Sequence, residues 1–151
     1  VAERLSVPFL AAGPLRGPHG EEASLIHLQA LGVLDGPELA ALLARRPVFV
    51  SAATFGPFGL AVLEAAQAGC PLVLSDIPTF RELWDGAALF VDPREETQFA
   101  EAIERVLGDE ALFERFSRTA VARAKRFIPT STAAEMAPIY AGVLARVEAA
   151  A

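Results

Sequence analysis

Five short apolar runs, separated by stretches with helical spacing, constrain the fold of this chain more than any other feature. The runs are rich in β-branched or aromatic residues, are bounded by Gly, Pro or Asp, and occupy residues 7–11, 31–34, 48–51, 72–75 and 88–91. Strands that are apolar along their whole length are typical of a parallel sheet covered on both faces, because the crossover helices lie over it. The pattern therefore predicts a doubly wound α/β fold.

The stretches between the runs carry the signals of helix starts and ends. Helical spacing is found at residues 21–30, 37–45, 60–68 and 79–84. Pro37 after Gly36 is typical of a first helical position, and Gly69 followed by Pro71 ends the third helix. After the fifth run the pattern contains helices only, at residues 95–107, 110–127 and from Ser131 or Thr132 onward. We expect residues 1–151 to form one domain, with helices on both faces of a parallel sheet and a helical C-terminal tail.

Composition excludes several classes of function. The formal net charge of -6 argues against a surface that gathers nucleic-acid phosphates or anionic lipid. No apolar run approaches the roughly 20 residues of a membrane span, and the start of the chain lacks the pattern of a signal peptide. His19 and His27 lack metal-ligand neighbours, and the single cysteine, Cys70, is interpreted as a small buried hydrophobe. We expect a cytoplasmic protein without a metal.

Glu64 is the only side chain between Arg46 and Asp76 that is charged at neutral pH. It lies in the predicted helix at residues 60–68, which is apolar on nearly all sides. A carboxylate on a buried helix needs hydrogen-bond partners, and the hydroxyls of a ligand are one source of them. The alternative is that Glu64 faces water on a narrow polar stripe with Gln67, as most glutamates do.

The loop before this helix, residues 54–59, carries two glycines and follows the run at residues 48–51. In parallel sheets ligands bind beyond the carboxyl ends of the strands, and a helix N-terminus reached through glycines offers free N–H groups to phosphate. Gly59 and Leu60 are placed to donate to a diphosphate, with Glu64 about one turn further on, near an attached ribose. Many such loops bind nothing, so the spacing alone leaves nucleotide binding and a structural turn both open.

Residues 48–78 resemble the C-terminal domain signature of retaining GT-B glycosyltransferases, the group that contains sucrose synthases, glycogen synthases and bacterial mannosyl- and glucosyltransferases. The resemblance continues through residues 80–93 and the C-terminal helices, so it covers essentially the whole chain. It implies a Rossmann-like domain that binds a nucleoside-diphosphate sugar without a metal or other cofactor. It also implies an N-terminal domain or subunit that holds the acceptor across a cleft.

The resemblance further implies roles for single residues. Glu64 matches the second acid of the paired-glutamate motif, which holds the donor ribose, whereas the first acid, eight positions earlier, is replaced by Gly56. Since glycine offers no side chain to the transferred sugar, no catalytic residue is assigned. Other matched positions face the diphosphate and sugar or, around Val33, border the nucleobase. The residues assigned to donor binding are Gly56, Pro57, Phe58, Gly59, Leu60, Glu64, Gly32 and Leu34.

Two parts of the family pattern are not found in this sequence. Residues 7–11 match the second strand of the family's domain, so the first strand, which lies centrally in the usual strand order, and the Arg and Lys after it are missing. We expect this strand and the acceptor domain to lie elsewhere, and the chain alone to be inactive. The alternative function, favoured by Gly56 and the missing basic pair, is a degenerate, non-catalytic module for nucleotide binding or protein interaction.

Overall fold

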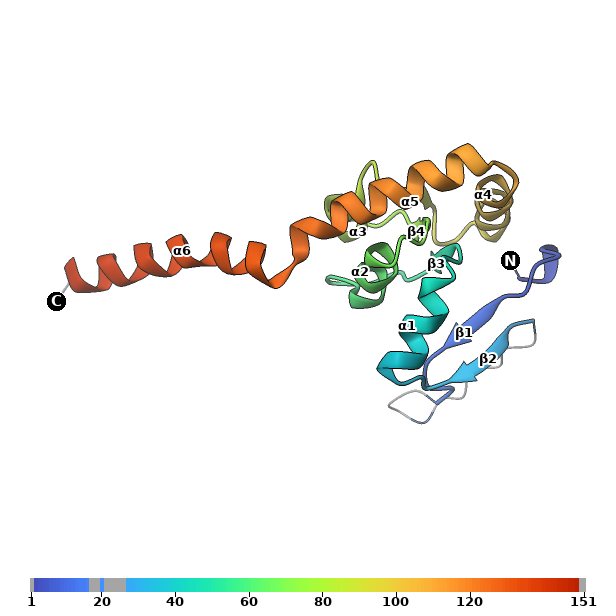
Figure 1. Cartoon of the computed structure of the whole chain (residues 1–151), viewed down its shortest axis with the longest axis horizontal. Helices are drawn as coiled ribbons and strands as arrows, with labels where there is room; N and C mark the ends of the chain where they lie inside the picture. The colour runs from blue at the N-terminus through green and yellow to red at the C-terminus, as the bar shows by residue number, and fades with distance from the viewer. Residues whose placement is uncertain (1, 17–19, 21–26, 150–151) are drawn as a thin grey trace.

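The structure is a computed structural model that describes residues 2–16, 20 and 27–149. From β2 to β5 strands and helices alternate, and the rest of the chain is helical (Figure 1). The elements are η1 (Ala2–Arg4), β1 (Leu10–Ala12), β2 (Gln29–Gly32), α1 (Gly36–Ala44), β3 (Phe49–Ser51), α2 (Leu60–Gln67), β4 (Leu72–Ser75), α3 (Pro78–Trp84), β5 (Ala88–Val91), α4 (Glu96–Gly108), α5 (Glu110–Ala124), η2 (Lys125–Phe127) and α6 (Pro129–Ala149). The predicted α/β class and helical C-terminal tail are confirmed.

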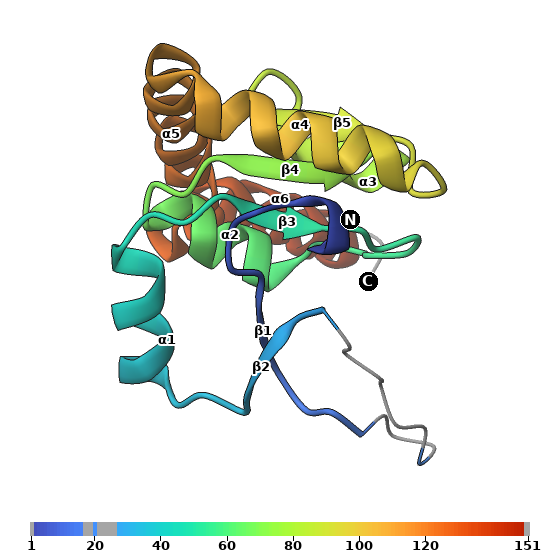
Figure 2. The same ribbon diagram turned by 90° about the vertical axis from the view of Figure 1, so that its right-hand side faces the viewer.

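The strand pairing is parallel throughout, but the strands form two sheets. β1 pairs with β2, and β3, β4 and β5 form a second sheet in that order. Within the described part of the chain no ladder joins the two sheets, and Figure 2 shows the β1–β2 pair well apart from β3. The Rossmann-like arrangement is therefore present, with its sheet divided between β1 and β3.

Predicted and observed boundaries agree to within three residues from β3 onward, whereas the two strands before it are displaced along the chain. The predicted strand at residues 7–11 begins only at Leu10, since Pro8 has no N–H group for the ladder. The predicted helix at residues 21–30 is wrong at its end, because Gln29 and Ala30 belong to β2, and residues 21–26 lie outside the described residues. His27 consequently lies in a turn and not on a helix.

The strand predicted at residues 31–34 is also displaced. β2 ends at Gly32, whose φ of 69° lies in the left-handed region and turns the chain out of the strand. Asp35 then caps α1: its side chain accepts from the N–H of Glu38, whose side chain accepts from the N–H of Asp35 in return. This capping box leaves Val33 and Leu34 as a connection between strand and helix.

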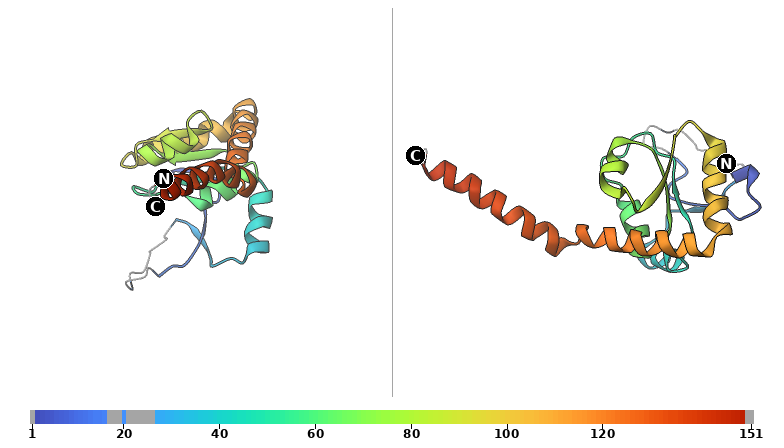
Figure 3. Two further views of the ribbon diagram at one scale, coloured as in Figure 1. Left: turned by 90° about the vertical axis from the view of Figure 1, so that its left-hand side faces the viewer. Right: turned by 90° about the horizontal axis from the view of Figure 1, so that it is seen from above.

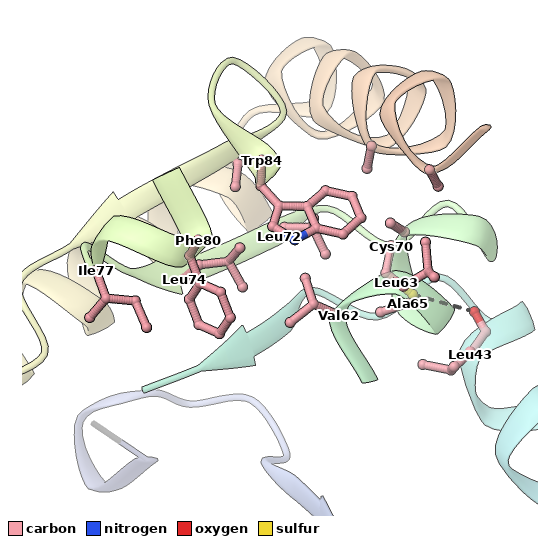
Figure 4. Packing of buried hydrophobic residues seen from close by; sticks show 14 residues of the cluster. Leu43, Val62, Leu63, Ala65, Cys70, Leu72, Leu74, Ile77, Phe80 and Trp84 are labelled. Atoms are coloured by element: carbon pink, nitrogen blue, oxygen red, sulfur yellow. Dashed lines mark hydrogen bonds between the residues drawn. The ribbon is translucent and has the colours of Figure 1, made fainter. Parts of the chain in front are cut away.

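Both faces of the three-stranded sheet are covered by helices. All four residues of β4 are buried, and alternate side chains point to opposite faces. Leu72 and Leu74 pack with side chains of α2 and α3, among them Phe80 and Trp84 (Figure 4). Val73 packs in the other cluster, against side chains of α4 and α5. The core of the molecule is thus built around β4.

Cys70 is part of this core. Its thiol is fully buried and donates to the carbonyl oxygen of Leu43 at 3.6 Å, the contact dashed in Figure 4. Burial raises the pKa of the Cys70 thiol to about 11. The interpretation of Cys70 as a buried, apolar-type side chain is therefore confirmed.

The C-terminal helix α6 projects away from the body of the molecule (Figure 1, Figure 3). It begins at Pro129, two residues earlier than predicted, directly after the extended residue Ile128. A run of large apolar side chains is exposed along it: Ile139, Tyr140, Val143, Leu144 and Val147. No helix in the part of the chain that the structure describes has both the length and the hydropathy to cross a membrane.

Candidate functional site

The first turn of α2 is open to an outside acceptor. Gly59 is its N-cap, with φ 79° and ψ 68°, and no side chain caps the helix. The N–H groups of Val62 and Leu63 bond to the carbonyl of Gly59, whereas among the described residues those of Leu60 and Ala61 have no protein acceptor. Free N–H groups and the positive end of the helix dipole favour an anion here. This agrees with the place predicted for a diphosphate.

The loop at residues 54–59 needs its two glycines because it lies against the ring of Phe80. A Cβ at Gly59 would lie 3.1 Å from both Phe80 and Val62, and one at Gly56 would lie 3.3 Å from the Phe80 ring. The hydroxyl of Thr79 also donates to the carbonyl of Gly56 at 2.7 Å. The start of α3 is therefore the support of the loop, which sequence reasoning missed because glycine spacing does not show what lies beneath it.

Glu64 lies on the solvent-facing stripe of α2. Its side chain is exposed, as are those of Leu60 and Gln67, while Val62, Leu63, Ala65 and Ala66 form the buried face. The expectation that this helix is buried on nearly all sides is wrong, because one full side of α2 is uncovered. The alternative, an exposed stripe shared with Gln67, is confirmed. Within the described residues the Glu64 carboxylate has no hydrogen bond or ion pair, so it is free to bind a ligand.

The two other loop residues that were assigned to donor binding, Pro57 and Phe58, differ in their surroundings. Pro57 is exposed. Phe58 is half-buried, and its ring meets the ring of Phe127 edge to face, with centroids 5.5 Å apart. Residues 56–60 and Glu64 thus lie together at the entrance of α2, as predicted.

The two nucleobase positions belong to the other sheet. Gly32 ends β2, and Leu34 is half-buried in the connection to α1. They follow the carboxyl end of a strand, as residues 54–59 do, but no strand pairing ties β2 to β3 in the described chain. Their role beside a base is therefore still a prediction.

A hollow of about 390 Å³ lies at the carboxyl ends of β3, β4 and β5. Ligands of parallel sheets bind at this edge. Its lining includes Thr54, the first residue of the loop, and Asp76 and Asp92, which directly follow β4 and β5. Sequence reasoning did not assign these carboxylates, although an aspartate directly after each apolar run was a usable signal.

One of these carboxylates, that of Asp76, forms an ion pair with Arg81. The Nε and Nη2 of Arg81 donate to the two oxygens of Asp76 at 2.6 and 2.7 Å, and its guanidinium lies 4.1 Å from the centre of the Phe90 ring. The hydrogen bonds from Arg81 lower the pKa of Asp76. Arg81 therefore forms a surface ion pair with Asp76.

A larger hollow, about 640 Å³, lies at the opposite end of the β1–β2 pair, where the strands begin. Its lining includes Phe9, His27 and Gln29. It offers neither an uncapped helix N-terminus nor a free carboxylate one turn away, so we assign the candidate site to the entrance of α2. Among the residues that are described, no three His, Cys, Asp or Glu side chains gather as metal ligands.

The fold and the open helix entrance at its carboxyl edge define a Rossmann-like domain with a candidate anion site. Comparison with known proteins gives the family: residues 21–123 match "Glycosyl transferases group 1", and the chain belongs to this family. It is similar to a glycogen synthase of Mycobacterium tuberculosis, with 41% identity over 92 residues, which are 60% of this chain and 22% of that protein. The predicted resemblance is thereby confirmed.

Solved structures show the same fold. A sucrose-phosphate synthase from Thermosynechococcus elongatus matches with a TM-score of 0.81 and 22% identity, over 96% of this chain and 40% of that one. Anabaena Alr3699/HepE in complex with UDP-glucose matches with a TM-score of 0.66 and 22% identity, over 78% of this chain and 33% of that one. The chain thus spans well under half the length of these three proteins.

Proposed function

We propose that this chain binds a nucleoside-diphosphate sugar and forms the donor half of a retaining glycosyltransferase. The observation that carries the proposal is the uncapped entrance of α2, with the unpaired carboxylate of Glu64 one turn away on the same exposed stripe. The family and the UDP-glucose bound to Alr3699/HepE support this class of ligand.

In this proposal the backbone N–H groups at the start of α2 bind the charged diphosphate of the donor. The N–H groups of Leu60 and Ala61 donate to the diphosphate oxygens, and the carboxylate of Glu64 accepts from the ribose hydroxyls. When the bond between sugar and diphosphate breaks, negative charge grows on the diphosphate. The same N–H groups stabilise that charge without any rearrangement.

This chain contributes less to binding the transferred sugar than to binding the diphosphate. Gly56 stands where the family pattern has an acid, and the Phe80 ring fills the space beside it. Neither residue offers a carboxylate that could accept from a sugar hydroxyl or stand opposite positive charge at the anomeric carbon. The acceptor, and the groups that bring it to the donor, therefore belong to an N-terminal domain or subunit.

The open strand edges support a further strand between the two sheets. The carbonyl of Phe9 and the N–H of Gly13 face β2, so Leu10 and Ala12, between them, direct their backbone groups to the other edge. Val50 of β3 likewise faces away from β4, since the N–H of Phe49 bonds to Pro71. Neither edge carries the charge or proline that normally protects one. One parallel strand placed there would join both sheets.

The test is a calorimetric titration with the diphosphates of uridine, guanosine and adenosine. At least one of them should bind the parent chain. Its dissociation constant should rise about tenfold in Glu64→Ala, because the carboxylate loses its hydrogen bonds to the ribose. Gln67→Ala, on the same exposed stripe, is the matched control and should bind as the parent does. Equal affinity of both variants would show that Glu64 has no role in binding.

The alternative is a degenerate module that keeps donor binding or protein interaction without transfer. Gly56 favours it, because the position of the first acid carries no side chain. The complete two-domain protein with Gly56→Glu distinguishes the two functions, and Phe80→Leu is added to make room for the new side chain. Gain of sugar-nucleotide hydrolysis or transfer over a Gly56→Gln control would indicate a lost catalytic acid.

A further inference from the structure

The loop at residues 54–59 is held by two contacts of different origin. Near its middle, the Thr79 hydroxyl and the Phe80 ring of α3 hold Gly56. Near its end, the ring of Phe58 packs edge to face on Phe127, with 5.5 Å between centroids and 87° between planes. The first contact lies within the body of the domain. The second comes from the segment that leads to α6.

Phe127 also packs against a second aromatic ring, that of Trp84. Its ring lies 5.8 Å from the ring of Trp84, centroid to centroid. Trp84 is fully buried in the core cluster with Val62 and Leu72 (Figure 4), and its indole N–H has no acceptor among the described residues. Packing alone fixes the indole. Phe127 therefore lies between a fully buried ring of the core and the loop that enters α2.

The chain changes direction directly after Phe127. Phe127 ends η2, Ile128 is extended with ψ 151°, and α6 begins at Pro129. From this point α6 leaves the body (Figure 1, Figure 3). Since Ile128 is the one residue between η2 and α6, a change in the direction of α6 at its start would take place next to the ring that packs against Phe58.

We propose that Phe127 is a positioning residue for donor binding. By packing against Phe58 it fixes the backbone of the adjacent N-cap Gly59 and of the first N–H groups of α2. Phe127 lies two residues before the start of α6. This inference rests on the proposed function, because it concerns the loop that receives the diphosphate. It assigns to the aromatic series Trp84, Phe127 and Phe58 a role beyond the stability of the core.

The experiment compares UDP with uridine, which lacks the diphosphate, by NMR titration of the full chain. In Phe127→Leu the dissociation constant of UDP should rise about tenfold, because the backbone donors to the diphosphate lose their alignment. The uridine constant should stay the same. Phe113→Leu makes the same change in another half-buried ring, packed against the other core cluster, and should change neither constant.

A second pair of variants separates positioning from folding. Phe127→Tyr keeps the ring and should bind UDP as the parent does. Phe58→Leu removes the same contact from the loop side, so its effect and that of Phe127→Leu should not add in the double variant. The single Phe58→Leu variant decides the question if Phe127→Leu binds weakly through loss of fold, since it leaves Phe127 and the start of α6 unchanged.

Four results would overturn the inference. UDP binding in Phe127→Leu equal to that in Phe113→Leu would remove Phe127 from the site and leave the proposed function standing. Equal weakening of UDP and uridine, or full additivity with Phe58→Leu, would indicate general loosening instead of positioning. Absence of binding by the diphosphates of uridine, guanosine and adenosine alike would remove the proposed function, and this inference with it.

Discussion

The two parallel sheets of this chain are built from similar short apolar runs and reach different degrees of burial. All four residues of β4 are inaccessible, whereas β1 has two exposed residues of three and β2 two of four. The difference comes from the helices. Those on both faces of the three-stranded sheet pack on it, while the β1–β2 pair lacks such cover in the described residues. An apolar run thus specifies a strand, but its neighbours decide whether the strand becomes core.

The largest difference in the free energy of unfolding is expected between alanine substitutions of one leucine in each sheet. Leu72→Ala in β4 removes a fully buried side chain and should cost about 2–5 kcal/mol of unfolding free energy. Leu10→Ala in β1, where the leucine is 37% exposed, should cost less than about 1 kcal/mol. Urea denaturation followed by the fluorescence of Trp84, the single tryptophan, measures both. Equal losses would mean that the two sheets are equally part of the core.

Arg46 ties the connection between α1 and β3 to the body. Its Nη2 donates to Glu114 at 2.7 Å and to Ser117 at 2.8 Å. Arg46→Ala should lower the free energy of unfolding by about 1–3 kcal/mol, because these hydrogen bonds to a charged group are lost. Arg45→Ala, at the neighbouring exposed position, should change it by no more than about 0.5 kcal/mol. The same urea series tests this, and similar values for both variants would contradict it.

The capping box of α1 is expected to make a smaller contribution to the free energy of unfolding than Arg46 does. Asp35→Ala removes the acceptor of the Glu38 N–H and should cost about 1 kcal/mol. Asp35→Asn keeps a side-chain oxygen and should recover most of this loss. Thermal unfolding followed by circular dichroism provides the measurement. No difference between alanine and asparagine would show that the cap does not stabilise the helix that leads from one sheet to the other.

The smallest effect is expected at the exposed pair of Arg81 and Asp76. The pKa of Asp76 is lowered from 3.8 by the hydrogen bonds from Arg81, so its contribution to stability is present above that pH and is lost as the pH falls through the native pKa. Arg81→Gln should therefore unfold at a slightly lower temperature than the parent at neutral pH. The difference should vanish in acid. A difference that grows on acidification would contradict this ion pair.

Local signals were sufficient to predict the elements of the three-stranded sheet. β4 and β5 have the predicted limits, because each apolar run ends at an aspartate, and α2 begins at Leu60 after Gly59. The same signals failed at β2. The apolar residues Val33 and Leu34 extend the run beyond Gly32, where the backbone already turns away. Periodicity detects apolar residues, and it does not register a turn within their run.

The division of the sheet and the support of the loop could not be read from the sequence. Which strands pair depends on contacts between distant segments, and so do the rings of Phe80 and Phe127 beneath the loop at residues 54–59. The exposure of Glu64 shows the same limit. Its helix has the composition of a buried one, yet one side is left uncovered in this chain. The sequence was sufficient to bring residues 56–60 and Glu64 to one helix entrance, whereas their surroundings could not be predicted from it.

Titration of the labelled chain with UDP, followed through its backbone amide resonances, tests the central claim most directly. If the entrance of α2 receives the diphosphate, the amides of Gly59, Leu60 and Ala61 should shift together and saturate with a single dissociation constant. The amides of Phe9 and Gln29, at the larger hollow where β1 and β2 begin, should not move. Shifts confined to that hollow, or no shift at α2 under saturating UDP, would contradict the assignment of the donor site.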